Sequence, residues 1–307
     1  MKIGDAITTM RDDLGDGFYK LTTSSTTVTK TNYPDMFEYL TSSSTSDRSY
    51  TFDSDSSYRY SAGMYYINGY WIVYYSNNKR MYYTTDITGS WSSVTLSSAP
   101  GSVGNEGSFH ITYLNGYYIL CGDNGIAYST SINGTWTYKA ISSGKIVTDI
   151  IRYNGYYVVG LQAYTGSSSS VSYTSYAYCT TLNGTWTEYQ LFNYKSLSGS
   201  FITLSVINNC IYMCVDYSGA LRLYRFTDVT GGDLTYSTLV SSGVYYYGRF
   251  YQYNGSLYLG VYKSSTESSV YKITPTTGLS YTTSSYTLPH ITSSTYECVS
   301  NIQFSNY

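Results

Sequence analysis

Short hydrophobic runs and polar turns alternate along most of this chain. In one stretch, the runs 109–113, 117–120, 126–129 and 136–139 are rich in Tyr, Thr and Ile, and segments containing Gly and Asn separate them. Aromatic and β-branched side chains are enriched in strands, and strands of about five residues are common in globular proteins. The stretch therefore predicts four short strands joined by tight turns.

A two-residue turn after the first run recurs along the chain. Its copies are Asn68-Gly69, Asn115-Gly116, Asn154-Gly155 and Asn254-Gly255, with Asn208-Asn209 as a weaker one. A type I′ hairpin turn needs positive φ at both central residues, and Asn-Gly is the dipeptide that favours it most. Each copy therefore predicts a β-hairpin.

A second motif, Gly-x-Trp, follows the hairpin in each repeat. Trp91, Trp136 and Trp186 hold this place in three repeats, and Leu234 and Tyr281 hold it in two more. These five positions are 45, 50, 48 and 47 residues apart. Repeats of this length with four strands each are typical of β-propeller blades.

We therefore predict an all-β fold, a β-propeller of four-stranded antiparallel blades. The repeats lie at approximately 55–98, 104–143, 144–192, 198–242 and 243–288. A sixth, composite blade would combine strands near residues 18–21, 26–29 and 49–52 with a closing C-terminal strand at 296–307. Five blades with a separate N-terminal domain are the alternative. A stack of independent hairpins is less favoured, because a single hairpin buries too little surface.

Charge is scarce, and this excludes some classes of partner. Charged residues make up 12% of the chain, and the formal net charge is −2. No basic surface is available for nucleic acid, so we expect no nucleic-acid partner. No run of about 18 apolar residues predicts a membrane span. The N-terminus shows no apolar signal segment, which predicts synthesis in a cytoplasm. A chain with 43 Tyr, 49 Ser and 40 Thr and few charged residues predicts a surface that suits use outside the cell.

Residues for metal or acid–base chemistry are also few. His110 and His290 are the two histidines. The five cysteines are Cys121, Cys179, Cys210, Cys214 and Cys298. No pair has the Cys-x-x-Cys spacing of a zinc or redox site, so buried free thiols are the favoured interpretation. We predict neither a cofactor nor a metal site, and we expect His110 to line the core or the central channel.

The turn before each tryptophan resembles a degenerate Asp box, the Ser-x-Asp-x-Gly-x-Thr-Trp signature of sialidase-type propellers. Asp86 and Trp91 match it in the first repeat, Ser129 and Trp136 in the second, and Trp186 in the third. In that family the box is a structural element between the third and fourth strands, and its Trp packs between blades. The resemblance implies structural roles for these five residues and says nothing about catalysis.

Residues 3–40 resemble the tail-collar domain of bacteriophage tail fibres. The matching residues are Gly4-Asp5, Gly17-Phe18, Val28, Tyr33-Pro34 and Met36-Phe37, whereas Thr22-Thr23-Ser24-Ser25 replaces the family's Cys-Asp-Gly turn. We assign this segment to residues 1–46 and expect a short helix near 33–40. The resemblance implies a virion protein that is made in the host cytoplasm and acts extracellularly. It also implies assembly with other virion proteins as a homo-oligomer.

A sialidase-like enzyme would need an arginine cluster and a set of paired acidic residues. Arg80 and Arg222 lie near predicted blade ends, but the eight arginines lack the spacing of that family. Glu106, Glu188 and Glu267 fall in predicted loops or on a fourth strand, and none has a recognisable partner. Two carboxylates at a suitable separation are enough for glycoside hydrolysis, so the 14 Asp leave an enzyme as a less favoured alternative.

Strand direction places the Asn-Gly and Gly-x-Trp turns at one end of every blade, so the remaining turns share the opposite face. We predict ligand contacts on that face from Asn78, Arg80, Asp123, Tyr164, Tyr217 and Tyr262. Tyrosine stacks on the apolar faces of sugars, and amides and carboxylates pair with their hydroxyls. Loops of variable length on a fixed scaffold are common places for recognition.

These features together favour a non-enzymatic virion propeller, in a tail fibre or tail tip, that contacts a host surface glycan or other virion proteins. A structural cap or decoration protein of the virion is the first alternative. A glycan-cleaving, sialidase-like tailspike enzyme is the second.

Overall fold

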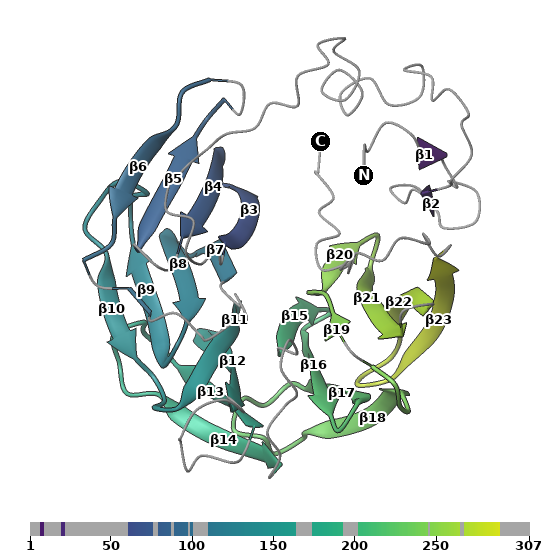
Figure 1. Ribbon diagram of the computed structural model, residues 1–307. Helices are drawn as coiled ribbons and strands as arrows, with labels where there is room; N and C mark the ends of the chain where they lie inside the picture. The colour runs from purple at the N-terminus through teal and green to yellow at the C-terminus, as the bar shows by residue number, and fades with distance from the viewer. Residues whose placement is uncertain are drawn as a thin grey trace.

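Five antiparallel sheets surround a common centre in this all-β protein (Figure 1). The computed structural model describes residues 7–8, 20–21, 61–75, 79–86, 89–97, 99–100, 110–163, 174–192, 202–244, 246–264 and 267–288. All regular elements among these residues are strands. The five sheets follow one another around the centre in chain order, and we number them as blades one to five.

Each of the first four blades is a meander in which consecutive strands pair antiparallel. Blade one contains β3 (Ser61–Ile67), β4 (Tyr70–Tyr75), β5 (Arg80–Thr84) and β6 (Ser92–Thr95). Blade two contains β7 (His110–Leu114), β8 (Tyr117–Gly122), β9 (Gly125–Ser129) and β10 (Thr137–Ala140). Blade three contains β11 (Lys145–Tyr153), β12 (Tyr156–Ala163), β13 (Thr174–Cys179) and β14 (Thr187–Phe192). Blade four contains β15 (Thr203–Ile207), β16 (Cys210–Tyr217), β17 (Ala220–Phe226) and β18 (Thr235–Val240).

Blade five differs at its inner edge, where two short strands share one position. Both β19 (Tyr246–Tyr247) and β20 (Tyr251–Tyr253) pair with β21 (Ser256–Ser264). The blade continues through β22 (Glu267–Pro275) to β23 (Tyr281–Leu288). A separate pair joins β1 (Ile7–Thr8) to β2 (Lys20–Leu21). The first strand of each blade lies nearest the centre and the fourth outermost, which is the arrangement of a β-propeller (Figure 1).

The recurring two-residue turns adopt the predicted hairpin geometry. Asn115 and Gly116 have φ of 50° and 84°, and all the other copies also have positive φ at both residues. Even Asn208 and Asn209 follow the pattern, with φ of 51° and 55°. Asparagine tolerates this region better than other residues with a Cβ, so the weaker copy still forms its turn.

The same turns tie neighbouring blades together. The Asn68 amide of blade one donates to the Tyr118 hydroxyl of blade two at 2.9 Å. The Asn115 amide of blade two donates to the Tyr157 hydroxyl of blade three at 3.3 Å. The Asn-Gly motif therefore sets the hairpin and also contributes a contact between blades.

The turn between the third and fourth strands also repeats. In four blades a glycine N–H donates to the carbonyl three residues earlier. These bonds join Gly89 to Asp86, Gly134 to Ser131, Gly184 to Thr181 and Gly231 to Asp228. Side chains reinforce three of them. The Thr84 hydroxyl accepts from the Asp86 N–H at 3.1 Å, the buried Ser129 hydroxyl accepts from the Ser131 N–H at 3.3 Å, and the Asp233 carboxylate accepts from the Asp228 N–H at 2.9 Å.

Two of the tryptophans that follow these turns, Trp136 and Trp186, pack toward the preceding blade. Trp136 is buried in a cluster that also contains Ile72 and Met81 of blade one. Trp186 is partly buried against a cluster shared by blades two and three. Trp91 is partly buried in blade one. The Trp136 and Trp186 rings therefore contribute to packing between blades.

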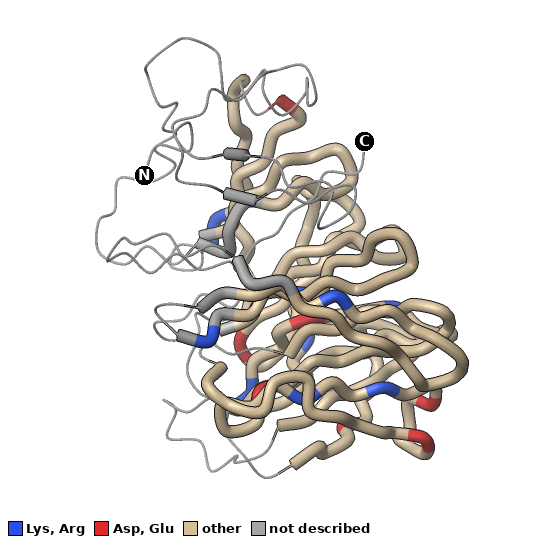
Figure 2. Tube along the Cα trace, turned by 90° about the vertical axis from the view of Figure 1, so that its right-hand side faces the viewer, with Lys and Arg blue, Asp and Glu red and all other residues tan. Residues whose placement is uncertain are grey.

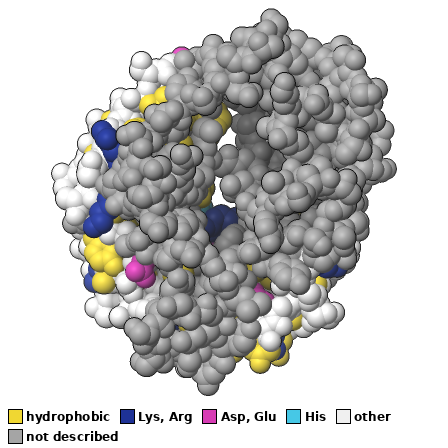
Figure 3. Space-filling view, in the orientation of Figure 1, with side chains coloured by type: hydrophobic (Ala, Val, Ile, Leu, Met, Phe, Trp, Pro, Cys, Tyr) yellow, Lys and Arg dark blue, Asp and Glu magenta, His cyan; other side chains and the backbone are white. Residues whose placement is uncertain are grey.

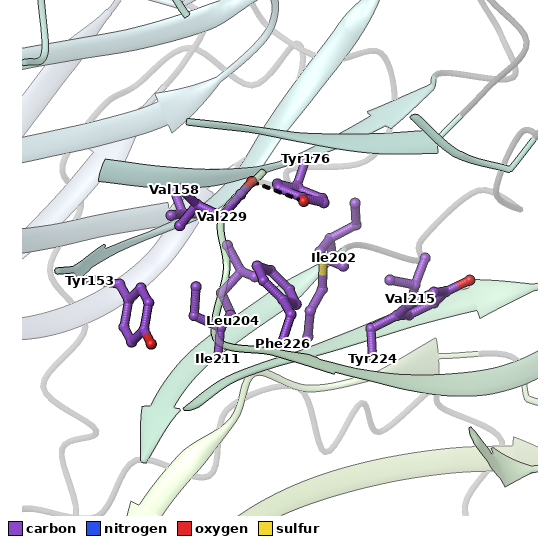
Figure 4. Packing of buried hydrophobic residues seen from close by; sticks show 11 residues of the cluster. Tyr153, Val158, Tyr176, Ile202, Leu204, Ile211, Val215, Tyr224, Phe226 and Val229 are labelled. Atoms are coloured by element: carbon purple, nitrogen blue, oxygen red, sulfur yellow. Dashed lines mark hydrogen bonds between the residues drawn. The ribbon is translucent and has the colours of Figure 1, made fainter. Parts of the chain in front are cut away.

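The hydrophobic core lies between the blades. One cluster joins Val158 and Tyr176 of blade three to Ile211 and Phe226 of blade four (Figure 4). Within it, the Tyr176 hydroxyl donates to the Val229 carbonyl at 3.0 Å. Comparable clusters join the other pairs of consecutive blades. Each sheet thus buries its faces against its neighbours, which a single blade cannot do alone.

Charged residues are few on this fold. Figure 2 shows Lys, Arg, Asp and Glu as short isolated segments of the trace. Among the described residues, no helix is long and apolar enough to cross a membrane.

Several expected features fall outside the described residues. They include the helix near 33–40, most of the tail-collar-like segment 1–46, and the composite blade with its closing strand at 296–307. His290 and Cys298 also fall outside them. These expectations stay predictions.

Candidate functional site

The sheet topology defines two ends of every blade. Because consecutive strands are antiparallel, the Asn-Gly turns and the turns before the fourth strands lie at one end. The turns between second and third strands lie at the opposite end, together with the connections to the next blade. This confirms the deduction from strand direction, and we call the second end the loop end.

The described members of the predicted ligand set lie at the loop end of different blades. Arg80 begins β5, Asp123 follows β8, and Tyr217 ends β16, each at the turn between second and third strands. Tyr262 lies in β21, and only its backbone is described. Asn78 and Tyr164 lie outside the described residues. The residues thus belong to different blades.

Asp123 belongs to a turn that is bonded to blade three. It forms an isolated β-bridge with Ile146, and its carbonyl accepts from the Tyr138 hydroxyl at 3.4 Å. The neighbouring Asn124 side chain accepts from the Gly144 N–H at 2.6 Å. Burial raises the pKa of the Asp123 carboxyl group. These contacts give the Asp123 turn a structural role between blades.

Arg80 is an exposed residue on the outer part of blade one. Its Nε donates to the Ser93 hydroxyl at 3.2 Å, and its guanidinium lies 5.3 Å from the centre of the Tyr82 ring. Arg80 thus contacts residues of its own blade.

Tyr217 belongs to a cluster around Arg222 that we call the arginine stack, made of Phe192, Tyr217, Arg222 and Tyr236. The Arg222 guanidinium carbon lies 3.5 Å from the centre of the Tyr217 ring and 4.7 Å from that of Tyr236. It lies 5.8 Å from the Phe192 ring, which meets Tyr217 edge-on. One cation is therefore surrounded by three aromatic side chains.

The arginine stack lies where blades three and four meet. Arg222 is two residues from Tyr224 and four from Phe226 on β17, so all three share the sheet face that packs against blade three. Phe192 ends β14 of blade three, and Figure 1 shows β14 and β18 next to each other in the outer part of the ring. Tyr236 is 53% exposed, so the stack is open to solvent.

A second polar cluster lies at the centre of the ring, and we call it the axial cluster. The innermost segment of each blade contributes one side chain to it: Tyr65, His110, Asp149, Thr203 and Arg249. Figure 3 shows the molecule hollowed at its centre, with a basic side chain at the wall. His110 and Arg249 keep 15% and 19% of their side-chain surface exposed, whereas Asp149 is nearly buried. The cluster therefore combines buried charge with limited access to solvent.

Asp149 is the hub of the axial cluster. One carboxylate oxygen accepts from the Ile150 N–H at 2.8 Å and lies 3.3 Å from His110 Nε2. The other accepts from the Leu204 N–H at 2.8 Å and from the Thr203 hydroxyl at 3.2 Å, and it lies 3.5 Å from Arg249 Nη1. The residues that contact Asp149 thus come from four blades.

Burial governs the ionisation of this cluster. Burial raises the pKa of Asp149, and Arg249 with the N–H donors opposes that rise. Burial and the Arg249 charge hold the pKa of His110 well below its ordinary value, so the imidazole is neutral at pH 7. Burial also raises the pKa of Tyr65, against the charge and hydrogen bond of Arg249. The site thus holds one ion pair among neutral groups.

The expectation that His110 lines the core or the central channel is confirmed, whereas Asp149 and Arg249 were not predicted as site residues. A signal for both was present. His110, Asp149, Thr203 and Arg249 each stand five residues before the first asparagine of their hairpin turn. A polar residue at one position of four repeats indicates a shared polar site. Blade one departs from the pattern, because Gly63 holds this position and the pairing of β3 is irregular between Ser61 and Met64.

A third ionic contact lies within blade three. The buried Lys145 ammonium bonds the Glu188 carboxylate and donates to the Ser175 hydroxyl at 2.7 Å. Burial lowers the pKa of Lys145, and Glu188 opposes that effect. Glu188 therefore has a cation partner.

The cysteines fit the buried-thiol interpretation. Cys121, Cys179, Cys210 and Cys214 are free and buried. Burial raises the pKa of the Cys210 thiol to about 11. Among the described residues, no group of three or more His, Cys, Asp or Glu side chains is arranged to hold a metal ion.

No family model and no curated protein sequence matches the chain. Solved structures with a similar fold include a β-1,3-galactosidase of glycoside hydrolase family 43 bound to galactodeoxynojirimycin, with 13% identity and a TM-score of 0.42 over 63% of this chain and 79% of that one. YCF48 bound to D1 peptide has 14% identity and a TM-score of 0.42 over 67% and 61%. Regucalcin, a calcium-binding protein from Agrobacterium tumefaciens, has 12% identity and a TM-score of 0.44 over 72% and 71%. These likenesses concern the fold alone.

Proposed function

We propose that this protein is a non-enzymatic binding propeller that recognises a surface glycan, as part of a bacteriophage tail fibre or tail tip. The observation that carries the binding function is the arginine stack. It presents aromatic side chains at the meeting of two blades, and it includes Tyr217, which the sequence analysis placed at a ligand face.

The chemistry of the stack suits a sugar. Tyr236 is a half-exposed aromatic ring, and the faces of sugar rings are apolar enough to pack on such a surface. The phenol and guanidinium groups can pair with ring hydroxyls at the edges. Tyrosine side chains also lose little conformational entropy on binding, as in antibody paratopes. The stack therefore offers both stacking and hydrogen bonding.

The two carboxylates that pair with a cation, those of Asp149 and Glu188, favour binding over hydrolysis. A glycosidase needs two carboxyl groups about 5 Å apart, or about 6.5–9.5 Å apart for inversion, on either side of the bond that breaks. Within the axial cluster Asp149 is the single carboxylate, and its oxygens already accept from fixed donors. Glu188 is held by Lys145. Neither is arranged as a general acid or base.

The viral setting rests on the tail-collar-like segment rather than on the propeller. It predicts that an antibody raised against the purified propeller labels the tail or fibres of a tailed particle in negative-stain electron micrographs. Labelling of no particle would leave a glycan-binding propeller without a viral role.

The binding function is tested on an array of bacterial surface polysaccharides. Tyr236→Ala should lower binding by about tenfold, because removing an aromatic ring from beneath a stacked ligand costs on the order of 1–3 kcal/mol, the range known for stacked nucleobases. Tyr66→Ala is the matched control, since Tyr66 is 55% exposed but lies beside the Asn-Gly turn of blade one. A reducing-sugar release assay runs in parallel.

The outcomes separate the candidate functions. Binding without release, lost in Tyr236→Ala and kept in Tyr66→Ala, supports the proposal. Sugar release would instead support the glycan-cleaving tailspike. Absence of both binding and release would overturn the proposal in favour of a structural cap or decoration protein.

A further inference from the structure

We propose that Arg222 of the arginine stack binds the carboxylate of an acidic sugar, so that the glycan recognised is one that contains uronic or sialic acid residues. This inference rests on the proposed function and narrows its ligand class. Its starting point is the way in which the Arg222 guanidinium is held.

The aromatic rings fix the guanidinium while leaving its edges available. The guanidinium carbon lies 3.5 Å from the Tyr217 ring centre and 4.7 Å from the Tyr236 ring centre, so it contacts two ring faces. Stacking uses the faces of the planar guanidinium, whereas its N–H groups point outward in its plane. A group held in this way loses little entropy when it binds, because its position is already set.

Arg222 also differs in its partners from Arg152, Arg225 and Arg249. Arg249 lies against the Asp149 carboxylate, and Arg225 donates to the Leu279 carbonyl at 3.0 Å. Arg152 donates to the Thr180 carbonyl at 3.2 Å. Within the part of the chain that the structure describes, Arg222 meets aromatic rings and the Tyr224 hydroxyl, and no carboxylate forms an ion pair with it. Its positive charge is therefore available to an anion.

Blade three contains a cation near the position that corresponds to Arg222 in blade four, and there the protein itself supplies the counter-ion. Pairing between third and fourth strands is irregular at Thr174/Ser175 in blade three and at Leu221/Arg222 in blade four. Beside Ser175, the Lys145 ammonium is matched by Glu188 from the fourth strand. In blade three the residue opposite Ser175 is the uncharged Gln190, and Glu188 lies opposite Ala177. The corresponding residues of blade four are Thr238, opposite Arg222, and Tyr236, opposite Tyr224, so neither supplies an anion. In blade three the Glu188 carboxylate neutralises the cation. In blade four a carboxylate of the ligand would take this role for Arg222.

A sugar ring that carries a carboxylate can contact both the Arg222 guanidinium and the Tyr236 ring. Its two oxygens match the planar fork of a guanidinium, which can donate two parallel hydrogen bonds. The sugar ring that carries it would pack on the exposed Tyr236 ring. A neutral sugar can pack on Tyr236 but forms no ion pair with Arg222, so the acidic sugar should bind more tightly.

The test compares oligosaccharides that contain glucuronate, galacturonate or sialic acid with their carboxyl-reduced counterparts. The intact chain should bind at least one acidic oligosaccharide about tenfold more tightly than its reduced form, which corresponds to about 1.4 kcal/mol. Arg222→Met should remove this preference. Arg222→Lys should restore only part of it, because an ammonium group cannot bond a carboxylate through a planar fork.

Arg225→Met is the matched control, because Arg225 lies on the same strand and also stacks on a tyrosine, Tyr281, at 4.7 Å. It should keep the preference for the acidic form. Circular dichroism confirms that each variant is folded before binding is measured.

Three results would overturn the inference, each in a different way. Equal binding of acidic and carboxyl-reduced forms would refute the acidic ligand while the glycan-binding function stands. Absence of binding to every glycan would refute both. A preference for the acidic form that survives in folded Arg222→Met would place the anion site elsewhere.

Discussion

Arg249 and Arg222 are both partly buried arginines, yet they meet opposite surroundings. Arg249 lies in the axial cluster at the inner edge of blade five, 3.5 Å from the Asp149 carboxylate. Arg222 lies in the outer part of blade four between the rings of Tyr217 and Tyr236. The first charge is compensated inside the protein, and the second is held by aromatic rings.

The difference indicates a division of roles within one repeated fold. Asp149 gathers donors from blades two to five at the axis, so its removal affects several blades at once. The arginine stack joins only blades three and four and remains open to solvent. We expect the axial cluster to control stability and the arginine stack to control recognition.

The largest effect should come from Asp149→Ala. The substitution leaves Arg249 without its counter-ion and the Leu204 and Ile150 N–H groups without their acceptor, so it should cost about 3–5 kcal/mol of unfolding free energy. Urea unfolding followed by tryptophan fluorescence measures the change. Asp123→Ala is the control, because the half-buried Asp123 side chain serves a single turn and should cost about 1 kcal/mol. Equal costs for the two variants would contradict the role of Asp149 as hub.

Substitution of the two arginines should lower the free energy of unfolding by smaller and unequal amounts. Arg249→Met should cost about 1.5–3 kcal/mol, because Asp149 then stays buried without a cation. Arg222→Met should cost only about 0.5–1 kcal/mol, the contribution of its contacts with aromatic rings. The same urea titrations compare them. A larger loss of unfolding free energy for Arg222→Met than for Arg249→Met would contradict the proposal that the axial cluster controls stability.

The pH dependence of stability should show how much the neutral His110 imidazole contributes to the axial cluster. Burial and Arg249 lower the pKa of His110 in the folded protein, so folding disfavours its protonation. Its contribution to stability should be complete above the unfolded pKa of about 6.5 and should be lost as the pH falls through the folded pKa. The midpoint of urea unfolding should therefore fall on acidification from neutral pH. His110→Asn should flatten this dependence, whereas an unchanged pH profile would assign it to other groups.

Local signals made the repeated parts of this fold predictable. Asn115-Gly116 and its copies specify a turn by their own backbone preferences, so the sequence alone places the hairpins. The spacing of Trp91, Trp136 and Trp186 likewise predicted the length of a blade, because it can be counted directly along the sequence. Such features depend on a few neighbouring residues and need no knowledge of the tertiary structure.

The sites were harder to predict because they depend on how blades meet. Phe192 and Arg222 are 30 residues apart and belong to different sheets, and their contact follows from the packing of blade three on blade four. Tyr217 could be placed at the loop end from strand direction, but its stacking on Arg222 could not. Asp149 and Arg249 shared a visible position before the hairpin asparagine, yet only the contact between their side chains shows that this position forms one site.

The most direct test of the binding site is the NMR spectrum of the arginine side chains. The chain has eight arginines, so the Nε–Hε signals can be assigned with single substitutions such as Arg222→Met and Arg249→Met. On titration with the acidic oligosaccharide that binds most tightly, the Arg222 signal should shift in a saturable way while the Arg249 signal stays in place. A saturable shift of Arg249 with no change at Arg222 would contradict the account and move the binding site to the central channel.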